Sequence, residues 1–308
     1  MIENFMENLR PRIENFKITM KILLKSPASA IGLIIVIAYF LIALIDQVDP
    51  VILGITTNIN YLNPNFVNTA PQPPSWLTNP FNFSLPFGTT YPGINLYDGI
   101  MKAIRIDISF SLFVVVSGAL IGIVLGVFSA FYGGWFDEII MRLTDIFFSI
   151  PYLVLVIAMG VFLGRSLEIL SIGLIILWWP IYARVVRGQA LSIKEQTFVE
   201  AARASGVKNG KIIFRHVLPN TMAPIFVQFS FDLATIVLAL ATLYFIGFAP
   251  SNSYMPELGY LSSLGYEYAI VGDWWTIVFP GFALMIFALG MNLLGDGLRD
   301  ALDPRLRR

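Results

Sequence analysis

Six long apolar stretches alternate with polar segments along the chain, and each has a length suited to a membrane span. A helix needs roughly 20 residues to cross a hydrocarbon core about 30 Å thick. The expected transmembrane helices are residues 28–45, 108–134, 139–163, 169–183, 221–248 and 274–295. The pattern therefore predicts an all-α membrane protein with six transmembrane helices.

The lysine and arginine residues between the spans predict the orientation. They gather in the N-terminal segment, in the loop after the fourth span and at the C-terminus. The positive-inside rule places such segments in the cytoplasm. Both termini are therefore predicted to be cytoplasmic, and the large region 46–107 is predicted to be extracytoplasmic.

The segments outside the spans complete the predicted organisation. Apolar residues at helical spacing predict an amphipathic helix on the inner membrane surface within residues 1–27. Region 46–107 is rich in proline but carries Trp76, Phe81, Phe83 and Phe87, which favours a compact irregular cap over a disordered linker. Residues 108–297 would form a five-helix core with a cytoplasmic loop at 184–220, and 298–308 a cytoplasmic tail.

The composition agrees with a chain that is surrounded by lipid. Hydrophobic residues make up 56% of the 308 residues and charged residues only 13%, whereas soluble domains usually carry about 25% charged residues. The formal net charge is zero, so the charge indicates no nucleic-acid partner. We expect a multi-pass protein of the cell membrane.

The residues that many enzymes and metal sites need are missing from the sequence. There is no cysteine and a single histidine, His216, which excludes disulfides, thiolate ligands and multi-histidine metal sites. The chain also lacks the Gly-x-x-x-x-Gly-Lys-Ser/Thr loop that binds the phosphates of ATP. We therefore expect no enzyme activity, no metal site and no cofactor in this chain.

Charged residues inside the spans are candidates for function, because burying a charge in a membrane is costly. Arg142 and Asp145 lie three residues apart near the inner end of the third span, and we expect a structural ion pair there. Asp232 lies within the fifth span without a cationic neighbour at helical spacing. It is a candidate for a translocation path or for an interface with a partner subunit.

A row of small residues follows one face of the second span. Gly118, Gly122 and Gly126 recur every four residues, and Ala130 continues the row. Small residues at this spacing let another helix approach closely. Packing within this chain and a seam with a second membrane subunit both stay open.

The stretch "TFVEAARASG" stands in the cytoplasmic loop between two of the most apolar parts of the chain. Its helix formers run up to Gly206, a residue type that commonly ends a helix. A helix this short is unstable alone in water and needs a surface to pack on. It is either a surface helix on the chain's own bundle or a docking element for a soluble partner.

This stretch resembles the EAA loop in permease subunits of ABC importers. That loop has Glu-Ala-Ala, a glycine four residues after the second alanine, and a Leu-Pro pair further on. His216 replaces the usual isoleucine, as is familiar in the dipeptide/oligopeptide branch. The residues that match the motif or accompany it are Phe198, Glu200, Ala201, Ala202, Arg203, Gly206, Leu218 and Pro219.

Other segments are similar to the second permease of dipeptide-type systems. They include "KSPASAIGLII", "FYGGWFDEIIMRLTDIFFSIPYLVL" and "LRDALDPRLR". The chain departs from the pattern at Thr90, Ile94 and Asn95, which replace charged residues, and at Leu240, which replaces a glutamate. These departures lie where the identity of the solute would matter.

The resemblance implies a type I ABC importer permease fold and a set of partners. These are a homologous second permease, two cytoplasmic ABC ATPases that bind ATP and Mg, an extracytoplasmic solute-binding protein and the lipid bilayer. The ATPases would drive the change of conformation through residues 198–206. The solute would be peptide-like or, alternatively, an oligosaccharide. A stand-alone secondary transporter or channel is a distant alternative, because clear internal repeats are missing.

Overall fold

The computed structural model describes residues 17–45, 70–248, 250 and 256–302, and most of them are helical. Within this part of the chain, five helical segments are long and apolar enough to cross a membrane, or six if one bent pair counts as a single span. These five contain α2 (Pro27–Ile45), α5 (Leu96–Tyr132), α8 (Leu167–Lys194), α11 (Leu218–Phe245) and α13 (Trp275–Leu302). The all-α membrane fold is confirmed.

The predicted third span, 139–163, is not one continuous helix. It consists of α6 (Gly134–Phe148) and α7 (Tyr152–Leu163), which meet at an angle of 83°. Pro151 stands at the break and has φ −59°. Proline has no amide hydrogen to donate and disfavours the helical conformation in the residue before it, so the helix ends there.

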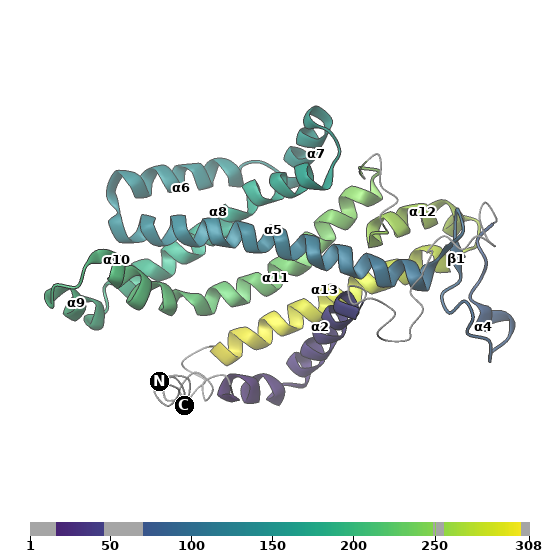
Figure 1. Ribbon diagram of the computed structural model, residues 1–308, viewed down its shortest axis with the longest axis horizontal. Helices are drawn as coiled ribbons and strands as arrows, with labels where there is room; N and C mark the ends of the chain where they lie inside the picture. Colours follow the sequence, from purple (N-terminus) through teal and green to yellow (C-terminus); the bar gives the residue numbers. More distant parts are fainter. Residues whose placement is uncertain (1–16, 46–69, 249, 251–255, 303–308) are drawn as a thin grey trace.

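Two groups of short elements occupy opposite ends of the molecule (Figure 1). One end carries α9 (Thr197–Ala204), α10 (Asn209–Ile212) and a π-helical turn, Ile213–Val217, that runs into α11. The other carries α12 (Leu258–Ile270) and the hairpin of β1 (Thr89–Thr90) and β2 (Ile94–Asn95). We call them the α9 end and the α12 end.

The row of small residues on α5 packs against α8, along the most extensive helix contact of the fold. A Cβ on Gly122 would fall on the Trp179 carbonyl oxygen and on Tyr182, and one on Gly126 would fall on the backbone of Ala183. A Cβ on Gly118 would lie 3.0 Å from Trp178. The first of the two alternatives, packing within the chain, is therefore confirmed.

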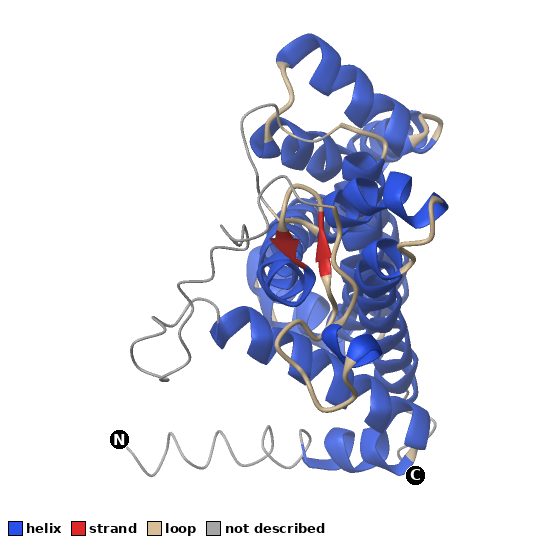
Figure 2. Ribbon diagram, turned by 90° about the vertical axis from the view of Figure 1, so that its right-hand side faces the viewer, coloured by secondary structure: helices blue, strands red, loops and turns tan. Residues whose placement is uncertain are grey.

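The described part of the predicted cap, residues 70–95, forms a compact segment over the α12 end (Figure 2). Its elements are α4 (Ser75–Thr78) and the hairpin. Trp76 Nε1 donates to the Pro86 carbonyl at 2.7 Å, and Phe87 stacks on Phe279 with ring centroids 4.4 Å apart. Phe81 and Phe83 are exposed instead of packed. Residues 46–69 lie outside the described part.

Several predicted boundaries are shifted in the structure. Helix α5 begins at Leu96, twelve residues before the predicted span, and its N-cap Asn95 accepts a hydrogen bond from Tyr97 N. Helix α13 continues to Leu302, inside the predicted tail. Residues 17–25 are helical, and residues 1–16, which carry most of the predicted amphipathic pattern, lie outside the described part. Helix α12 was not predicted.

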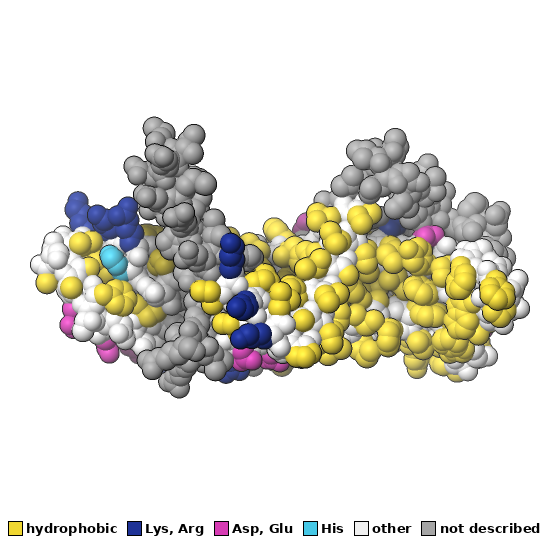
Figure 3. Space-filling model, turned by 90° about the horizontal axis from the view of Figure 1, so that it is seen from below, with side chains coloured by type: hydrophobic (Ala, Val, Ile, Leu, Met, Phe, Trp, Pro, Cys, Tyr) yellow, Lys and Arg dark blue, Asp and Glu magenta, His cyan; other side chains and the backbone are white. Residues whose placement is uncertain are grey.

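Large apolar side chains are exposed along the sides of the helices, as a lipid-facing surface requires. Ile34, Leu120 and Val154 are examples, each more than half exposed. Figure 3 shows this hydrophobic surface over the middle of the molecule and toward the α12 end, with Lys and Arg side chains gathered toward the α9 end. The gathering agrees with the orientation expected from the sequence.

Candidate functional site

Helix α9 ends in a regular C-terminal cap. The amide of Gly206 donates to the Arg203 carbonyl at 3.0 Å, and the amide of Val207 donates to the Ala202 carbonyl at 3.1 Å. This pair of bonds needs a residue with positive φ at the turn, and Gly206 has φ +74°. The glycine predicted to end the helix does so.

Among the described residues, contacts to one side of α9 attach it to the rest of the chain. Val199 is fully buried, and the guanidinium of Arg203 lies over the ring of Phe131, 5.9 Å from its centroid. Phe198 contacts His216, with ring centroids 6.4 Å apart, but remains 45% exposed. The helix is thus attached to the end of α5 and to the turn before α11.

The other side of α9 is exposed and carries the acidic residue of the motif. Glu200 and Ala201 are exposed, and Ala202 is half-buried. Among the described residues, no side chain pairs with the Glu200 carboxylate. The small alanine side chains leave the Glu200 carboxylate accessible. This surface suits recognition by another protein.

A network of polar contacts fixes the helices that carry α9. Asp137 of α6 binds Arg187 of α8 through two bonds, at 2.5 and 2.6 Å, and also accepts a hydrogen bond from Ser129 of α5. Lys194 Nζ donates to the Ala130 carbonyl at 2.8 Å. The sequence analysis missed this network. The only feature of the sequence that pointed to this network was the presence of charged residues at the ends of the spans.

The predicted pair of Arg142 and Asp145 is wrong. Arg142 pairs with Glu138 one turn earlier on α6, at 3.2 Å, and Asp145 pairs with Arg184 of α8, at 2.5 Å. These ion pairs are largely exposed and contribute little stability on their own. The Asp145 pair nevertheless ties α6 to α8, which a contact within one helix would not do.

The Leu-Pro pair of the motif marks the start of α11. Leu218 is the first residue of this helix and Pro219 the second, directly after the π-helical turn that runs into it. The π-helical turn before it buries Ile213 and Val217. The motif thus covers the whole connection from α9 to α11.

Asp232 is buried inside the subunit, with only 4% of its surface exposed. Its Oδ1 accepts a hydrogen bond from Gln228 Nε2 at 2.9 Å. Trp178 and Tyr182 of α8 face the same carboxyl group, but among the described residues neither they nor Asp232 Oδ2 has a hydrogen bond in good geometry. Because Asp232 is not on an exposed face, its position does not indicate a direct contact with a second subunit.

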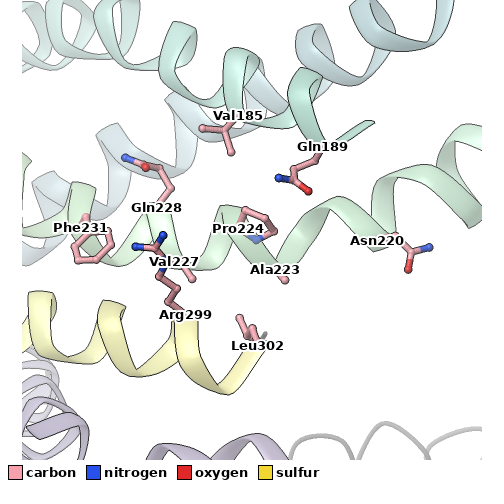
Figure 4. A pocket seen from close by; sticks show the side chains of 10 residues that line it. All are labelled: Val185, Gln189, Asn220, Ala223, Pro224, Val227, Gln228, Phe231, Arg299 and Leu302. Carbon is pink, nitrogen blue, oxygen red and sulfur yellow. The ribbon is translucent and has the colours of Figure 1, made fainter. Parts of the chain in front are cut away.

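A cavity of about 600 Å³ opens one turn away from Asp232, between α8, α11 and α13 (Figure 4). Gln228 belongs to its lining and connects it to the Asp232 carboxyl. Gln189, Asn220 and Arg299 add further polar groups. Figure 4 shows the Arg299 side chain extending from α13 toward α11. Asp232 is therefore connected through one amide to a cavity with several polar groups in its lining.

Comparison with known proteins identifies the family to which the chain belongs. Residues 122–308 match the model of the family described as binding-protein-dependent transport system inner membrane component. The chain belongs to this family. The inner membrane component family and the long apolar helices together place the protein in the plasma membrane as a multi-pass subunit.

Three curated relatives are similar over most of their length. The dipeptide transport system permease protein DppC of Alkalihalophilus pseudofirmus is 36% identical over 93% of this chain and 89% of its own. The glutathione transport system permease protein GsiD of Pectobacterium atrosepticum is 34% identical over 80% and 78%. The probable D,D-dipeptide transport system permease protein DdpC of Escherichia coli is 39% identical over 71% and 73%.

One solved structure shows the same fold. A chain of the inward-facing MetNI methionine ABC transporter aligns with a TM-score of 0.52 and 22% identity, over 67% of this chain and 97% of that one. The predicted type I importer permease fold is confirmed. The protein is a membrane permease subunit of an ABC importer, and a subunit of this kind functions with ATPases and a second permease.

Proposed function

We propose that this permease subunit forms half of the translocation path for a peptide-like solute. We also propose that α9 transmits the conformational change of an ATPase to the spanning helices. The ATPases would be two cytoplasmic subunits, and the path would be completed by a homologous second permease. An extracytoplasmic binding protein would deliver the solute. ATP binding and hydrolysis would take place in the ATPases, not in this chain.

The exposed Glu200 side of α9 is the observation that carries the proposal. Its carboxylate is free to pair with a cationic group of a partner, while Val199 and Arg203 attach the helix to the permease. The polar contacts between Asp137 and Arg187 join α6 and α8 beneath it. A displacement of α9 would therefore move several spanning helices together.

The peptide-like solute is supported by the names of the relatives, which are permeases for dipeptides, D,D-dipeptides and glutathione. No observation favours an oligosaccharide. Asp232, with the cavity beside it, is our candidate for the part of the path that responds to the solute. Uptake of dipeptides and of oligosaccharides into vesicles that hold the complete importer would test the solute class.

The decisive experiment reverses the charge of Glu200. Glu200→Lys should leave an inserted and folded permease, because the side chain is exposed and has no partner among the described residues to lose. Breaking a buried charge pair at an interface costs about 2–5 kcal/mol, which weakens association roughly thirtyfold to several thousandfold. A pull-down of the ATPase, run beside solute uptake, would measure this loss.

The control makes the same charge change at the other end of the molecule. Glu267 is an exposed glutamate on α12, and Glu267→Lys should leave ATPase recovery unchanged. If Glu200→Lys also recovers the ATPase normally and supports normal uptake, α9 is only a surface helix and the coupling proposal is wrong.

A further inference from the structure

Two acidic side chains meet deep inside the α12 end. Asp107 comes from α5 and is 1% exposed, while Glu257 is the N-cap of α12 and is 0% exposed. Glu257 Oε2 accepts a hydrogen bond from the Tyr260 amide at 2.8 Å. Asp107 Oδ2 accepts a longer one, of 3.4 Å, from the Leu258 amide. Each carboxyl group thus uses one oxygen on the backbone at the start of α12.

The second oxygen of each carboxyl group has no donor. Asp107 Oδ1 and Glu257 Oε1 are buried without a hydrogen-bond partner in the described structure, and so is the hydroxyl of Tyr244. Tyr244 of α11 is 1% exposed and interacts electrostatically with both acids. Three polar groups from α5, α11 and α12 therefore converge with unused hydrogen-bonding capacity.

No cation in the described part of the chain compensates the two acids. Among the described residues, the charged or titratable groups that act on them are each other and Tyr244. Lys102 and Arg105 precede Asp107 on α5 and act on neither carboxyl, and α13 and the hairpin contribute no group. Two adjacent carboxylates that are both ionised would repel each other in a buried site without a counter-charge from the described residues.

We propose that Asp107 and Glu257 bind one proton between them, and that this shared proton holds the N-terminus of α12 against α5. One carboxyl group, in its protonated form, donates its O–H to the free oxygen of the other, which is ionised. This single bond satisfies both of the oxygens that lack a donor. When the proton leaves to water, two carboxylates face each other, and the junction opens.

The pKa of Glu257 supports this arrangement. Burial raises its pKa from 4.5 to about 7, against the lowering effect of the backbone amides. A raised pKa means that the folded junction binds the proton more tightly than an open one does. Its stabilising effect is therefore complete below about pH 4.5 and is lost as the pH rises through about 7.

The contacts of α12 show what the proton would control. Gly259 leaves no room for a side chain against the backbone of Ala241 in α11, and Thr276 Oγ1 of α13 donates to the Gly265 carbonyl at 2.8 Å. Loss of the bond at the N-terminus would weaken the attachment of α12 to α5, while these contacts with α11 and α13 remain. The protein would thus respond to the proton concentration on the side of the membrane that α12 faces.

The absence of native cysteines makes an accessibility test direct. Leu261→Cys places a thiol at a position of α12 that is 0% exposed and faces Gly99 of α5, and Ile270→Cys places one at a position that is 70% exposed. Both variants of the full chain, in lipid nanodiscs, are labelled with a maleimide from about pH 5.5 to about pH 8.5. The ratio of the two rates cancels the pH dependence of thiol reactivity.

We expect the Leu261→Cys rate, relative to Ile270→Cys, to rise with pH by up to about tenfold per unit below about pH 7 and to level off above it. Adding Glu257→Gln or Asp107→Asn should flatten this rise, because an amide donates to the remaining carboxylate at every pH. The matched control, Glu267→Gln on the exposed side of α12, should keep it. A ratio that does not change with pH in the parent, or an unchanged rise with Glu257→Gln, would overturn the proposal.

Infrared spectroscopy gives a second readout that needs no cysteine and no folded variant. The unsubstituted chain should show the carbonyl stretch of a protonated carboxyl group at about pH 6, and this band should disappear near pH 8.5. If the band is missing at the lower pH, the two acids share no proton and the proposal is wrong.

Discussion

Helices α9 and α12 are both short connections between spanning helices, and they are built in opposite ways. Helix α9 has eight residues and buries only Val199, whereas α12 has thirteen and buries five of them. Each has a glutamate near its start, but Glu200 is exposed and Glu257 is 0% exposed. The same side chain at a helix start is thus exposed for the proposed contact with a partner in one place and enclosed within the subunit in the other.

The glycines of the two helices differ in the same way. Gly206 has φ +74° and nothing within 4 Å of a Cβ, so only its backbone conformation requires glycine. Gly259 has ordinary helical geometry, but a Cβ there would collide with the backbone of Ala241. One glycine ends an exposed helix, and the other lets a buried helix approach its neighbour.

The largest effect is expected for Gly259→Val. The valine side chain would meet the backbone of Ala241, which cannot rotate away, so α12 must move off α11. Overpacking of this kind costs about 3 kcal/mol, the upper end of the usual range. The loss would be measured as a lower midpoint of thermal unfolding in detergent.

Gly188→Val is the matched control. Gly188 lies in α8 with nothing within 4 Å of a Cβ, so the same substitution should change stability little. Equal midpoints for the two variants would mean that α12 is not packed closely on α11.

A smaller effect is expected for Gly206→Val. Forcing a side chain into this conformation costs about 1–2 kcal/mol, and the cost falls on the cap of α9 and not on the core. Recovery of the ATPase should drop while thermal unfolding of the permease changes only slightly. Gly210 lies in α10 with nothing within 4 Å of a Cβ, so Gly210→Val should change neither ATPase recovery nor thermal unfolding. Similar losses from both variants would assign the effect to the loop as a whole.

The smallest effect on stability is expected for Glu200→Gln. An exposed side chain without a partner should change the free energy of unfolding by no more than about 0.5 kcal/mol. Solute uptake and ATPase recovery should nevertheless fall, because the charge is meant for another protein. A stability loss well above that value would show that Glu200 supports the permease itself.

Much of the fold followed from local patterns in the sequence. Apolar length predicted the spanning helices, the repeat of Gly118, Gly122 and Gly126 predicted close helix packing, and Gly206 predicted the end of α9. Each of these signals depends on a residue and its near neighbours in the chain, which the sequence displays directly. The family motif then indicated the partner-facing role that α9 is proposed to have.

The remaining features depend on which parts of the chain meet in space. Asp145 pairs with Arg184 instead of Arg142 because α6 lies along α8, and no spacing within α6 reveals that neighbour. The junction of Asp107 with Glu257 joins helices that are far apart in sequence. Helix α12 was missed because its apolar residues are too few for a span. They become a buried face only between α11 and α13.

The length of α5 gives the α9 end a mechanical connection to the α12 end. Its 37 residues form a rod about 55 Å long, with Phe131 beneath Arg203 near one end and Asp107 beside Leu258 toward the other. The glycine row joins this rod to α8, so the two helices would tilt as one lever. Asp107 lies 24 residues, or about 36 Å, along the rod from Phe131, so a tilt of about 5° about that end displaces it by about 3 Å. A small rotation at α9 would therefore be enough to pull Asp107 away from α12.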